Sequence, residues 1–243
     1  MKNKHNWNPN KFIETKDGNN WIPNKNYPGI SNHSYIIASK QIKQYQKAIQ
    51  NNTSGYLLDC GCGDVPYYGI YKNLITDSYC IDWEYSPQKQ VHVDQFVNLN
   101  EKLTIPYTFD TILLSDVLEH IAEPKQLLQE LNKLLNPNGK IIIMVPFMYR
   151  LHEEPHDYYR YTEHGLRHLL NMSNYTVTEI ESYGGIVDVL FDMLNKGFFN
   201  TNKRAKILLN IYRLISKIGY FTRINNARKY SFPMGYTLVA HKK

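Results

Sequence analysis

Asp59, Gly61 and Gly63 follow a short apolar run, Tyr56 to Leu58, in the pattern D-x-G-x-G. Glycine has no Cβ and adopts positive φ readily, so glycines after a buried strand let the main chain approach a ligand closely. The pattern predicts a loop that cradles a small molecule. The structural alternative is a strand followed by a glycine turn that binds nothing.

The position of the acid separates two kinds of nucleotide-type cofactor. A dinucleotide fingerprint, G-x-G-x-x-G, turns a helix N-terminus towards a pyrophosphate, but Pro66 occupies the position of its third glycine. Asp59 lies inside the motif, where a carboxylate repels phosphate and attracts a cation. A second acid, Asp82, ends the next predicted strand. The arrangement favours a cationic cofactor over a dinucleotide.

The elements that must position this loop alternate between helix and strand. Apolar spacing predicts an amphipathic helix from Tyr35 to Ile49 with Ser34 as its N-cap. Short helices are expected at 67–74 and from Pro124 to the turn at 136–139, and strands at 56–58, 79–82, 91–97, 109–114 and 141–145. This alternation predicts a parallel sheet wound on both faces, with ligands outside the carboxyl ends of its strands.

The last third of the chain departs from this alternation. Strands are expected at 175–181 and 235–240, with two helical patterns between them in a helical insertion at about 186–230. Basic residues surround the second pattern. A functional interpretation of the insertion is a substrate lid, a dimer surface or a weak membrane-surface contact. The interpretation that we favour is a helical pair that covers the sheet and has a basic outer face.

Length and composition suit one globular core. The chain has 243 residues, of which 42% are hydrophobic. Residues 1–33 are rich in asparagine, so we expect an irregular N-terminal segment, either a floppy tail or a strap over the site. Residues 34–243 are expected to form the single domain.

The net charge and the hydropathy of the chain limit the kinds of partner that we expect. A net charge of +6 suits an anionic partner, although a solvated basic surface is the preferred explanation. No stretch approaches the roughly 18 apolar residues of a membrane span. We therefore expect a soluble, cytoplasmic protein without a transmembrane segment.

The three cysteines, Cys60, Cys62 and Cys80, lie on or beside the strands of the glycine loop. This placement predicts reduced thiols in a cytosolic protein. Cys60 and Cys62 have the spacing of half a metal site, but the matching half is missing. The sequence therefore predicts no metal.

An ordered set of motifs over residues 57–161 resembles the class I S-adenosylmethionine-dependent methyltransferases. The glycine loop comes first and Asp82 follows it. A Phe109-Asp110 pair, a Leu118-Glu119-His120 turn and the turn at 135–140 complete the set. The resemblance implies an α/β fold with a doubly wound, mostly parallel seven-stranded sheet, the Rossmann-like methyltransferase fold. It also implies a final antiparallel strand, and a helical insertion before that strand.

The same resemblance implies S-adenosyl-L-methionine as the cofactor. Asp82 corresponds to the acid that accepts both ribose hydroxyls, and Trp83 would lie against the adenine. Asn98 stands where the family generally has an aspartate at the adenine amine, and an amide oxygen can accept the same hydrogen bond. The cofactor-binding residues that the resemblance implies are Asp59, Gly61, Cys62, Gly63, Asp82, Trp83, Asn98, Leu99 and Ser115.

Residues 146–161 follow the fifth strand and are crowded with titratable groups. They resemble a subgroup of methyltransferases associated with surface polysaccharides and glycans. This implies a small polar acceptor such as a sugar or glycan precursor, with His120, His156 and Asp157 as catalytic residues. His152 is a further residue that could deprotonate the acceptor or hold a polar substrate. The structural alternative packs Tyr159 and Tyr161 in the core and pairs Arg160 with a neighbouring acid.

Two other functions stay open. One is a catalytically silent scaffold that binds the cofactor. The other is a nucleic-acid methyltransferase, but residues 115–118 lack the N-P-P-Y pattern, so we do not expect a nucleic-acid partner. The oligomeric state, and the methylated atom (O, N or C), are left open.

Overall fold

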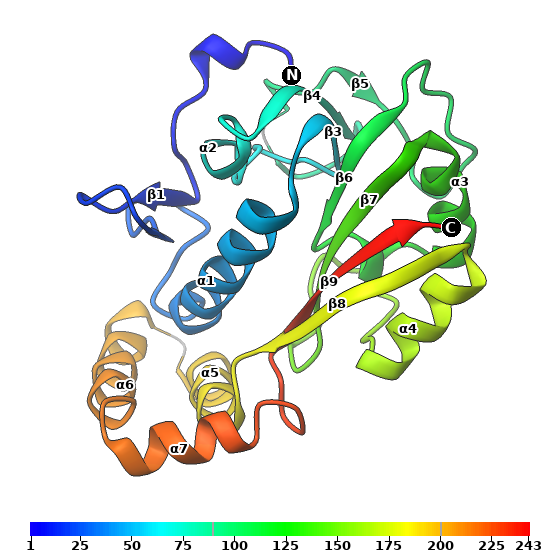
Figure 1. Ribbon diagram of the computed structural model, residues 1–243. Helices are drawn as coiled ribbons and strands as arrows, with labels where there is room; N and C mark the ends of the chain where they lie inside the picture. The colour runs from blue at the N-terminus through cyan, green and yellow to red at the C-terminus, as the bar shows by residue number, and fades with distance from the viewer. Residues whose placement is uncertain (89, 200) are drawn as a thin grey trace.

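The computed structural model describes residues 1–88, 90–199 and 201–243. Its centre is a seven-stranded sheet in the order β5-β4-β3-β6-β7-β9-β8 (Figure 1). The strands are β3 (Gly55–Cys60), β4 (Ile75–Asp82), β5 (Gln95–Phe96), β6 (Phe109–Ser115), β7 (Leu135–Pro146), β8 (Tyr175–Tyr183) and β9 (Gly235–Lys242). Strands β3 to β7 are paired in parallel, and β9 is antiparallel to both β7 and β8. The predicted fold class is confirmed.

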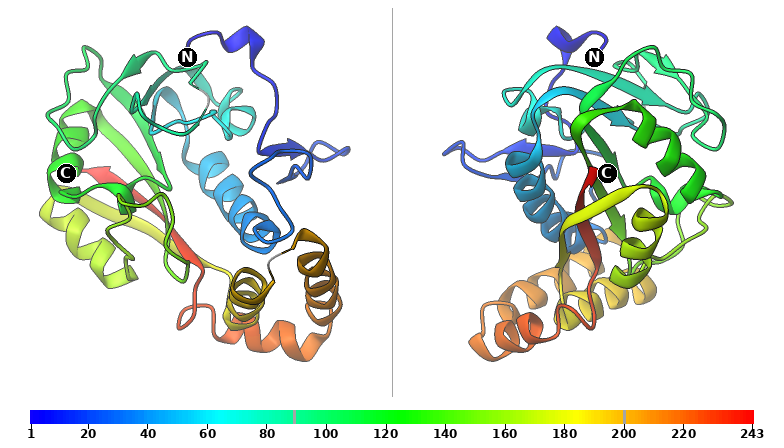
Figure 2. Two further views of the ribbon diagram at one scale, coloured as in Figure 1. Left: turned by 180° about the vertical axis from the view of Figure 1, so that it is seen from behind. Right: turned by 45° about the vertical axis from the view of Figure 1, so that its right-hand side comes forward.

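The central strands are apolar throughout because both faces of the sheet are covered. Leu113 and Ile142 contribute to one buried cluster, whereas their neighbours Ile112 and Ile143 contribute to the other. Helices α1 (Tyr35–Asn52) and α2 (Tyr68–Tyr71) lie on one face, and α3 (Pro124–Leu134) and α4 (Glu163–Met172) on the opposite face (Figures 1 and 2). The sheet is thereby fixed from both sides, and its carboxyl edge becomes a rigid platform.

Three helices follow β8: α5 (Ile186–Phe198), α6 (Asn202–Ile215) and α7 (Gly219–Ala227). They lie beyond the end of β8 and beside α1, not over a face of the sheet (Figure 1). Asp188 links α5 to both α6 and α1, because it accepts from Tyr212 Oη of α6 at 2.7 Å and pairs with Lys40 Nζ of α1 at 3.1 Å. This corrects the expectation of a helical pair that covers the sheet.

The N-terminal segment has regular structure where none was expected: a turn of 3-10 helix, η1 (Lys4–Asn6), and a hairpin of β1 (Phe12–Glu14) and β2 (Trp21–Pro23). Side chains tie it to the loop after the glycine motif. Trp7 Nε1 donates to the Val65 carbonyl at 3.1 Å, and Tyr27 Oη donates to Asp64 Oδ2 at 2.9 Å. The segment is therefore packed against the loop after the glycine motif and is not a floppy tail.

Other differences from the predicted elements are local. The strand expected at 91–97 is reduced to β5 because the Asp94 side chain, accepting from Cys80 N at 2.8 Å, takes the place of a main-chain partner. Helix α4 was not predicted, although Thr162 caps it by accepting from Gly165 N. Ser34 precedes α1, but its side chain makes no capping bond. Within the described ranges, no helix is both long and apolar enough to cross a membrane.

Candidate active site

The glycine loop joins β3 to α2 at the carboxyl edge of the sheet. Gly61 and Gly63 have φ of +70° and +53°, which L side chains rarely adopt. Gly61 N and Cys62 N both donate to the Ile81 carbonyl, at 2.9 and 3.0 Å. A Cβ on Gly61 would lie 2.4 Å from Val117 Cγ2. Glycine is therefore required at position 61 both by the backbone conformation and by the segment that follows β6.

Asp82 ends β4 and holds this loop in place. Its Oδ2 accepts from Gly63 N at 2.8 Å, and its Oδ1 accepts from Trp83 N at 2.7 Å. Burial raises the pKa of Asp82 above its usual value, although these two N–H groups act against that effect. Each carboxylate oxygen retains a second lone pair. Asp82 can thus organise the loop and still accept hydrogen bonds from a ligand diol.

A hollow of about 370 Å³ adjoins Asp82, and its volume falls in the range of small-ligand sites. Asn98 lies in its wall and is oriented on both sides, because its Nδ2 donates to Glu101 Oε1 at 2.8 Å and its Oδ1 accepts from Asn100 N at 3.1 Å. The lining residues are Trp83, Glu84, Tyr85, Phe96, Val97, Asn98 and Glu101. Of these lining residues, the sequence predicted only Trp83 and Asn98 as cofactor-binding residues, because the others belong to no recognised motif.

Three of the predicted cofactor residues have buried side chains. Asp59 is 2% exposed and accepts from Tyr71 Oη at 2.7 Å. Burial raises the pKa of Asp59 to about 7, against the effect of the Tyr71 hydrogen bond. Cys62 and Leu99 belong to the two cores, whereas Ser115 is half-buried at the end of β6. The side chains of Asp59, Cys62 and Leu99 therefore belong to the interior and do not line the hollow.

A second group of polar side chains faces the same edge. The 3-10 turn η2 (Leu118–His120) carries His120, whose Nδ1 lies 2.8 Å from the His156 carbonyl oxygen. His156 Nδ1 lies 3.0 Å from Tyr158 Oη, and its ring centroid is 5.6 Å from that of Trp83. His156 thus connects the loop after β7 to the hollow beside Asp82.

Asp157 and Arg160 form a two-bonded ion pair in that loop. Arg160 Nη1 and Nη2 donate to the Asp157 oxygens at 2.6 and 2.7 Å, and His152 N adds a third bond at 2.9 Å. Burial opposes ionisation, but these donors outweigh it and hold the pKa of Asp157 well below its usual range. Asp157 therefore holds the loop in shape.

The structural alternative for residues 146–161 predicted that Arg160 would pair with a neighbouring acid, and Asp157 is that acid. Tyr161 is buried and donates to the Leu118 carbonyl at 3.1 Å, as that alternative also required. Tyr159 is exposed, so its expected place in the core is wrong.

Asp116 is an acid that the motif search did not select. It has φ of +53° and accepts from Gln41 Nε2 and Tyr45 Oη of α1, each at 2.7 Å. Burial, followed by the charge of Glu119, raises the pKa of Asp116 to about 6. The sequence signal for Asp116 was indirect: polar Gln41 lies on the buried face of α1, which indicates a buried polar partner.

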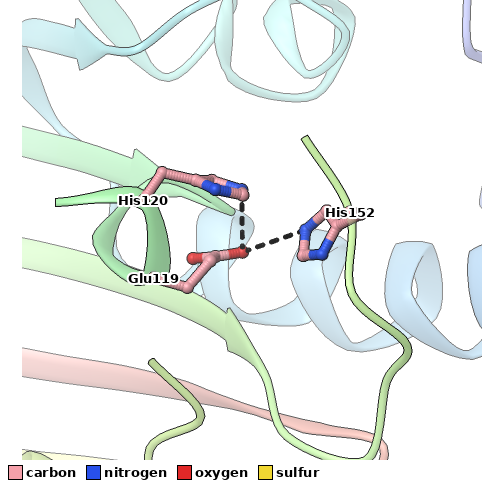
Figure 3. A group of neighbouring side chains, drawn as sticks. All are labelled: Glu119, His120 and His152. Atoms are coloured by element: carbon pink, nitrogen blue, oxygen red, sulfur yellow. Dashed lines mark ion pairs between the residues drawn. The ribbon is translucent and has the colours of Figure 1, made fainter. Parts of the chain in front are cut away.

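Glu119 and His152 complete the group. The sequence indicated His152 as a possible acceptor-side residue, but it gave Glu119 no role. Glu119 Oε1 lies 3.8 Å from Nε2 of His120 and 3.8 Å from Nε2 of His152 (Figure 3). The sequence offered a weak signal, because Glu119 precedes His120 in the turn after β6 and His152 stands in the crowded stretch after β7. Only folding brings the two segments together.

Comparison with known families identifies a methyltransferase domain, whose model matches residues 37–180. Among curated proteins, an uncharacterized protein of Methanocaldococcus jannaschii is 28% identical over 119 residues, which are 48% of this chain and 52% of that protein. The chain thus spans about half the length of the curated relative that it matches.

Solved structures share the fold. An S-adenosylmethionine-dependent methyltransferase from Clostridium acetobutylicum has a TM-score of 0.55 at 12% identity, covering 86% of this chain and 95% of that one. One from Archaeoglobus fulgidus has a TM-score of 0.54 at 15% identity, covering 82% and 90%. Phosphoethanolamine N-methyltransferase 2 of Haemonchus contortus, solved with S-adenosyl-L-methionine, has 0.52 at 16%, covering 87% and 56%.

Proposed function

Since the chain belongs to the methyltransferase domain family and is a class I S-adenosylmethionine-dependent methyltransferase, we propose that it methylates an oxygen or nitrogen of a small polar acceptor. A sugar or glycan precursor is the acceptor class that we expect. The observation that supports this proposal is the group of polar side chains on η2 and the loop after β7, immediately beside the glycine loop.

The residues at the carboxyl edge fit S-adenosylmethionine, which is the cofactor. A main-chain cradle without Cβ atoms lies against Val117, and the Asp82 carboxylate keeps lone pairs for the ribose hydroxyls. The hollow beside Asp82 offers aromatic faces and the Asn98 amide to an adenine. When bound, the sulfonium supplies an activated methyl group, so the protein has mainly to align the acceptor.

His156 and His120 are the proposed acceptor-side bases. A histidine changes charge near neutral pH and can remove a hydroxyl proton as the methyl group arrives. His156 is exposed and lies between the Trp83 ring and Tyr158 Oη, where it can contact an acceptor. Asp157 and Arg160 act on the acceptor indirectly, because they fix the loop that carries His156.

The test is incubation of the purified protein with methyl-labelled cofactor and separate sets of monosaccharides, nucleotide sugars, small amines and RNA. We expect labelled product from a hydroxyl or amine set, detected by mass spectrometry. His156→Gln should lower the rate by roughly 100-fold or more, as expected for the loss of a general base. His168→Gln, which changes an exposed histidine on α4, is the matched control and should be as active as the unmodified protein.

Turnover with RNA alone would contradict the proposed acceptor class. Full activity of His156→Gln would remove that residue from the mechanism. Normal binding of S-adenosylhomocysteine without turnover of any set would favour the silent scaffold.

A further inference from the structure

Glu119 is a fully buried acid at the carboxyl edge of the sheet. Its exposed fraction is 0%, and neither carboxylate oxygen has a hydrogen-bond partner among residues 1–88, 90–199 and 201–243. Removing an unpaired carboxylate from water costs several kcal/mol, so buried acids are paired, hydrogen-bonded or bound to a cation. Glu119 therefore depends for its charge balance on the groups that face it, and within the described residues these are two imidazoles.

Two histidines face this carboxylate from different segments. His120 Nε2 and His152 Nε2 each lie 3.8 Å from Glu119 Oε1, which is too long for a hydrogen bond. One ligand atom from each of the three residues lies within 4.8 Å of the other two. Figure 3 shows the three side chains converging from η2 and the loop after β7. The space between them is bordered by one oxygen and two nitrogens.

The far side of each imidazole is already engaged. His120 Nδ1 lies 2.8 Å from the His156 carbonyl oxygen, and His152 Nδ1 lies 3.3 Å from both Asp157 Oδ2 and Arg160 Nη2. Histidines that bind metals usually donate their second N–H to a carbonyl or carboxylate, which turns the lone pair of the other nitrogen towards the ion. The His156 carbonyl is such an acceptor for His120, and Asp157 is one for His152 in the tautomer that carries its proton on Nδ1. In these tautomers both Nε2 lone pairs can point towards Glu119.

We propose that Glu119, His120 and His152 bind one divalent transition-metal cation through Glu119 Oε1 and the two Nε2 atoms. Imidazole together with carboxylate suits ions such as Mn²⁺, Fe²⁺, Co²⁺ and Zn²⁺. A cation about 2.1 Å from each atom requires separations of roughly 3.0 to 3.5 Å, so small side-chain rotations close the site. This proposal departs from the expectation of no metal, which depended on cysteine spacing.

The site is reachable and has unused coordination positions. The side chains of His120 and His152 are 14% and 18% exposed, whereas Glu119 is fully enclosed. Glu153 Oε2, 3.8 Å from His120 Nε2, is a further oxygen at the rim. An acceptor hydroxyl can take a remaining position. That catalytic role rests on the proposed function, whereas binding of the cation does not.

The experiment titrates Co²⁺ into protein that has been stripped with a chelator and desalted. We expect one Co²⁺ per chain, seen by calorimetry and by visible absorption, and competition by Zn²⁺. Glu119→Gln and His152→Ala should each weaken Co²⁺ binding by at least roughly 100-fold, because loss of an outer partner alone costs about 10- to 100-fold. His168→Ala, on the exposed face of α4, is the matched control and should bind Co²⁺ normally.

A second measurement covers variants that fold poorly. Glu119→Gln removes the buried charge with little change in shape, so the stripped variant should melt no earlier than the stripped unmodified protein. Added Co²⁺ should raise the melting temperature of the unmodified protein alone. Absence of Co²⁺ binding, or unchanged binding by Glu119→Gln, would overturn the proposal. The affinity for S-adenosylhomocysteine, measured on the same samples, separates this failure from a failure of the proposed function.

Discussion

The two halves of the carboxyl edge, one beside the glycine loop and one beside η2, differ at the acid that each buries most deeply. In the half beside the glycine loop, Asp59 accepts from Tyr71 and Asp82 accepts from two main-chain N–H groups. In the half beside η2, Glu119 is equally buried but has no hydrogen-bond partner in the part of the chain that the structure describes. The fold completes the first half, whereas in the second it satisfies Asp116 and Asp157 but leaves the Glu119 carboxylate without a hydrogen bond.

This difference suggests how the site divides its work. A cradle for a constant cofactor can be assembled in advance, because its hydrogen-bond partners are part of the same chain. A pocket for a cation and an acceptor has to keep donor atoms unpaired until those groups arrive. Variants in the first half should therefore affect cofactor binding and stability, and variants in the second should affect metal binding and turnover.

The largest expected effect is at Gly61. Gly61→Leu introduces a Cβ 2.4 Å from Val117 Cγ2 at a φ of +70°, so the loop must move away from its cofactor-binding position. We expect affinity for S-adenosylhomocysteine, measured by calorimetry, to fall at least roughly 1000-fold, or about 4 kcal/mol. Gly197→Leu is the control, since a Cβ on Gly197 meets nothing within 4 Å. Unchanged affinity of Gly61→Leu would show that the cofactor does not use this loop.

The next effect is at Asp82. Asp82→Ala removes the acceptor proposed for the ribose and should weaken S-adenosylhomocysteine binding by about 2 to 4 kcal/mol, or roughly 30- to 700-fold. The sequence predicts hardly any loss of stability. The bonds from Gly63 N and Trp83 N revise this to about 1 to 3 kcal/mol in chemical denaturation.

Asp77→Ala is the control for Asp82→Ala, because it removes another acid of β4 and shows whether any such loss weakens cofactor binding. Asp77 is half-exposed and pairs with Lys4 at the opposite end of the strand, so its loss should leave cofactor affinity unchanged. An Asp82→Ala protein that binds the cofactor normally but melts much earlier would make Asp82 a structural residue only.

The smallest effect is a pH dependence of stability at Asp59. Its pKa of about 7 in the folded protein exceeds the ordinary 3.8, so the folded state holds a proton that the unfolded state has lost. Stability from this group is fully present below about pH 4 and is lost as pH rises to about 7. Between pH 5 and pH 8, the unmodified protein should lose roughly 2 to 3 kcal/mol more free energy of unfolding than Asp59→Asn.

The measurement is urea denaturation of both proteins at the two pH values. Equal losses would mean that Asp59 is ionised in the fold. That result would weaken the view that this half satisfies its own acids, because a buried charge would then need a partner beyond Tyr71.

Much of the first half was predictable because its signals are local. The D-x-G-x-G pattern marks a strand that ends in a loop, and Asp82 ends the following strand. Periodicity located α1, α3, α5 and the central strands. It failed at 91–97, where the side chain of Asp94 replaces a main-chain partner, and at the N-terminal segment, where Trp7 and Trp21 form hydrogen bonds with distant residues.

The sequence by itself determined the fold class and the position of the glycine loop, because both depend on the order of apolar runs and glycines along the chain. The cofactor was implied by the family resemblance. Only the tertiary structure brought His152 to within 3.8 Å of Glu119 and assigned Asp157 to hold the loop in place. The physical reason is that adjacent parallel strands bring their carboxyl ends together, while the path of each following loop depends on packing. Spacing along the chain does not record which side chains that packing leaves without a partner.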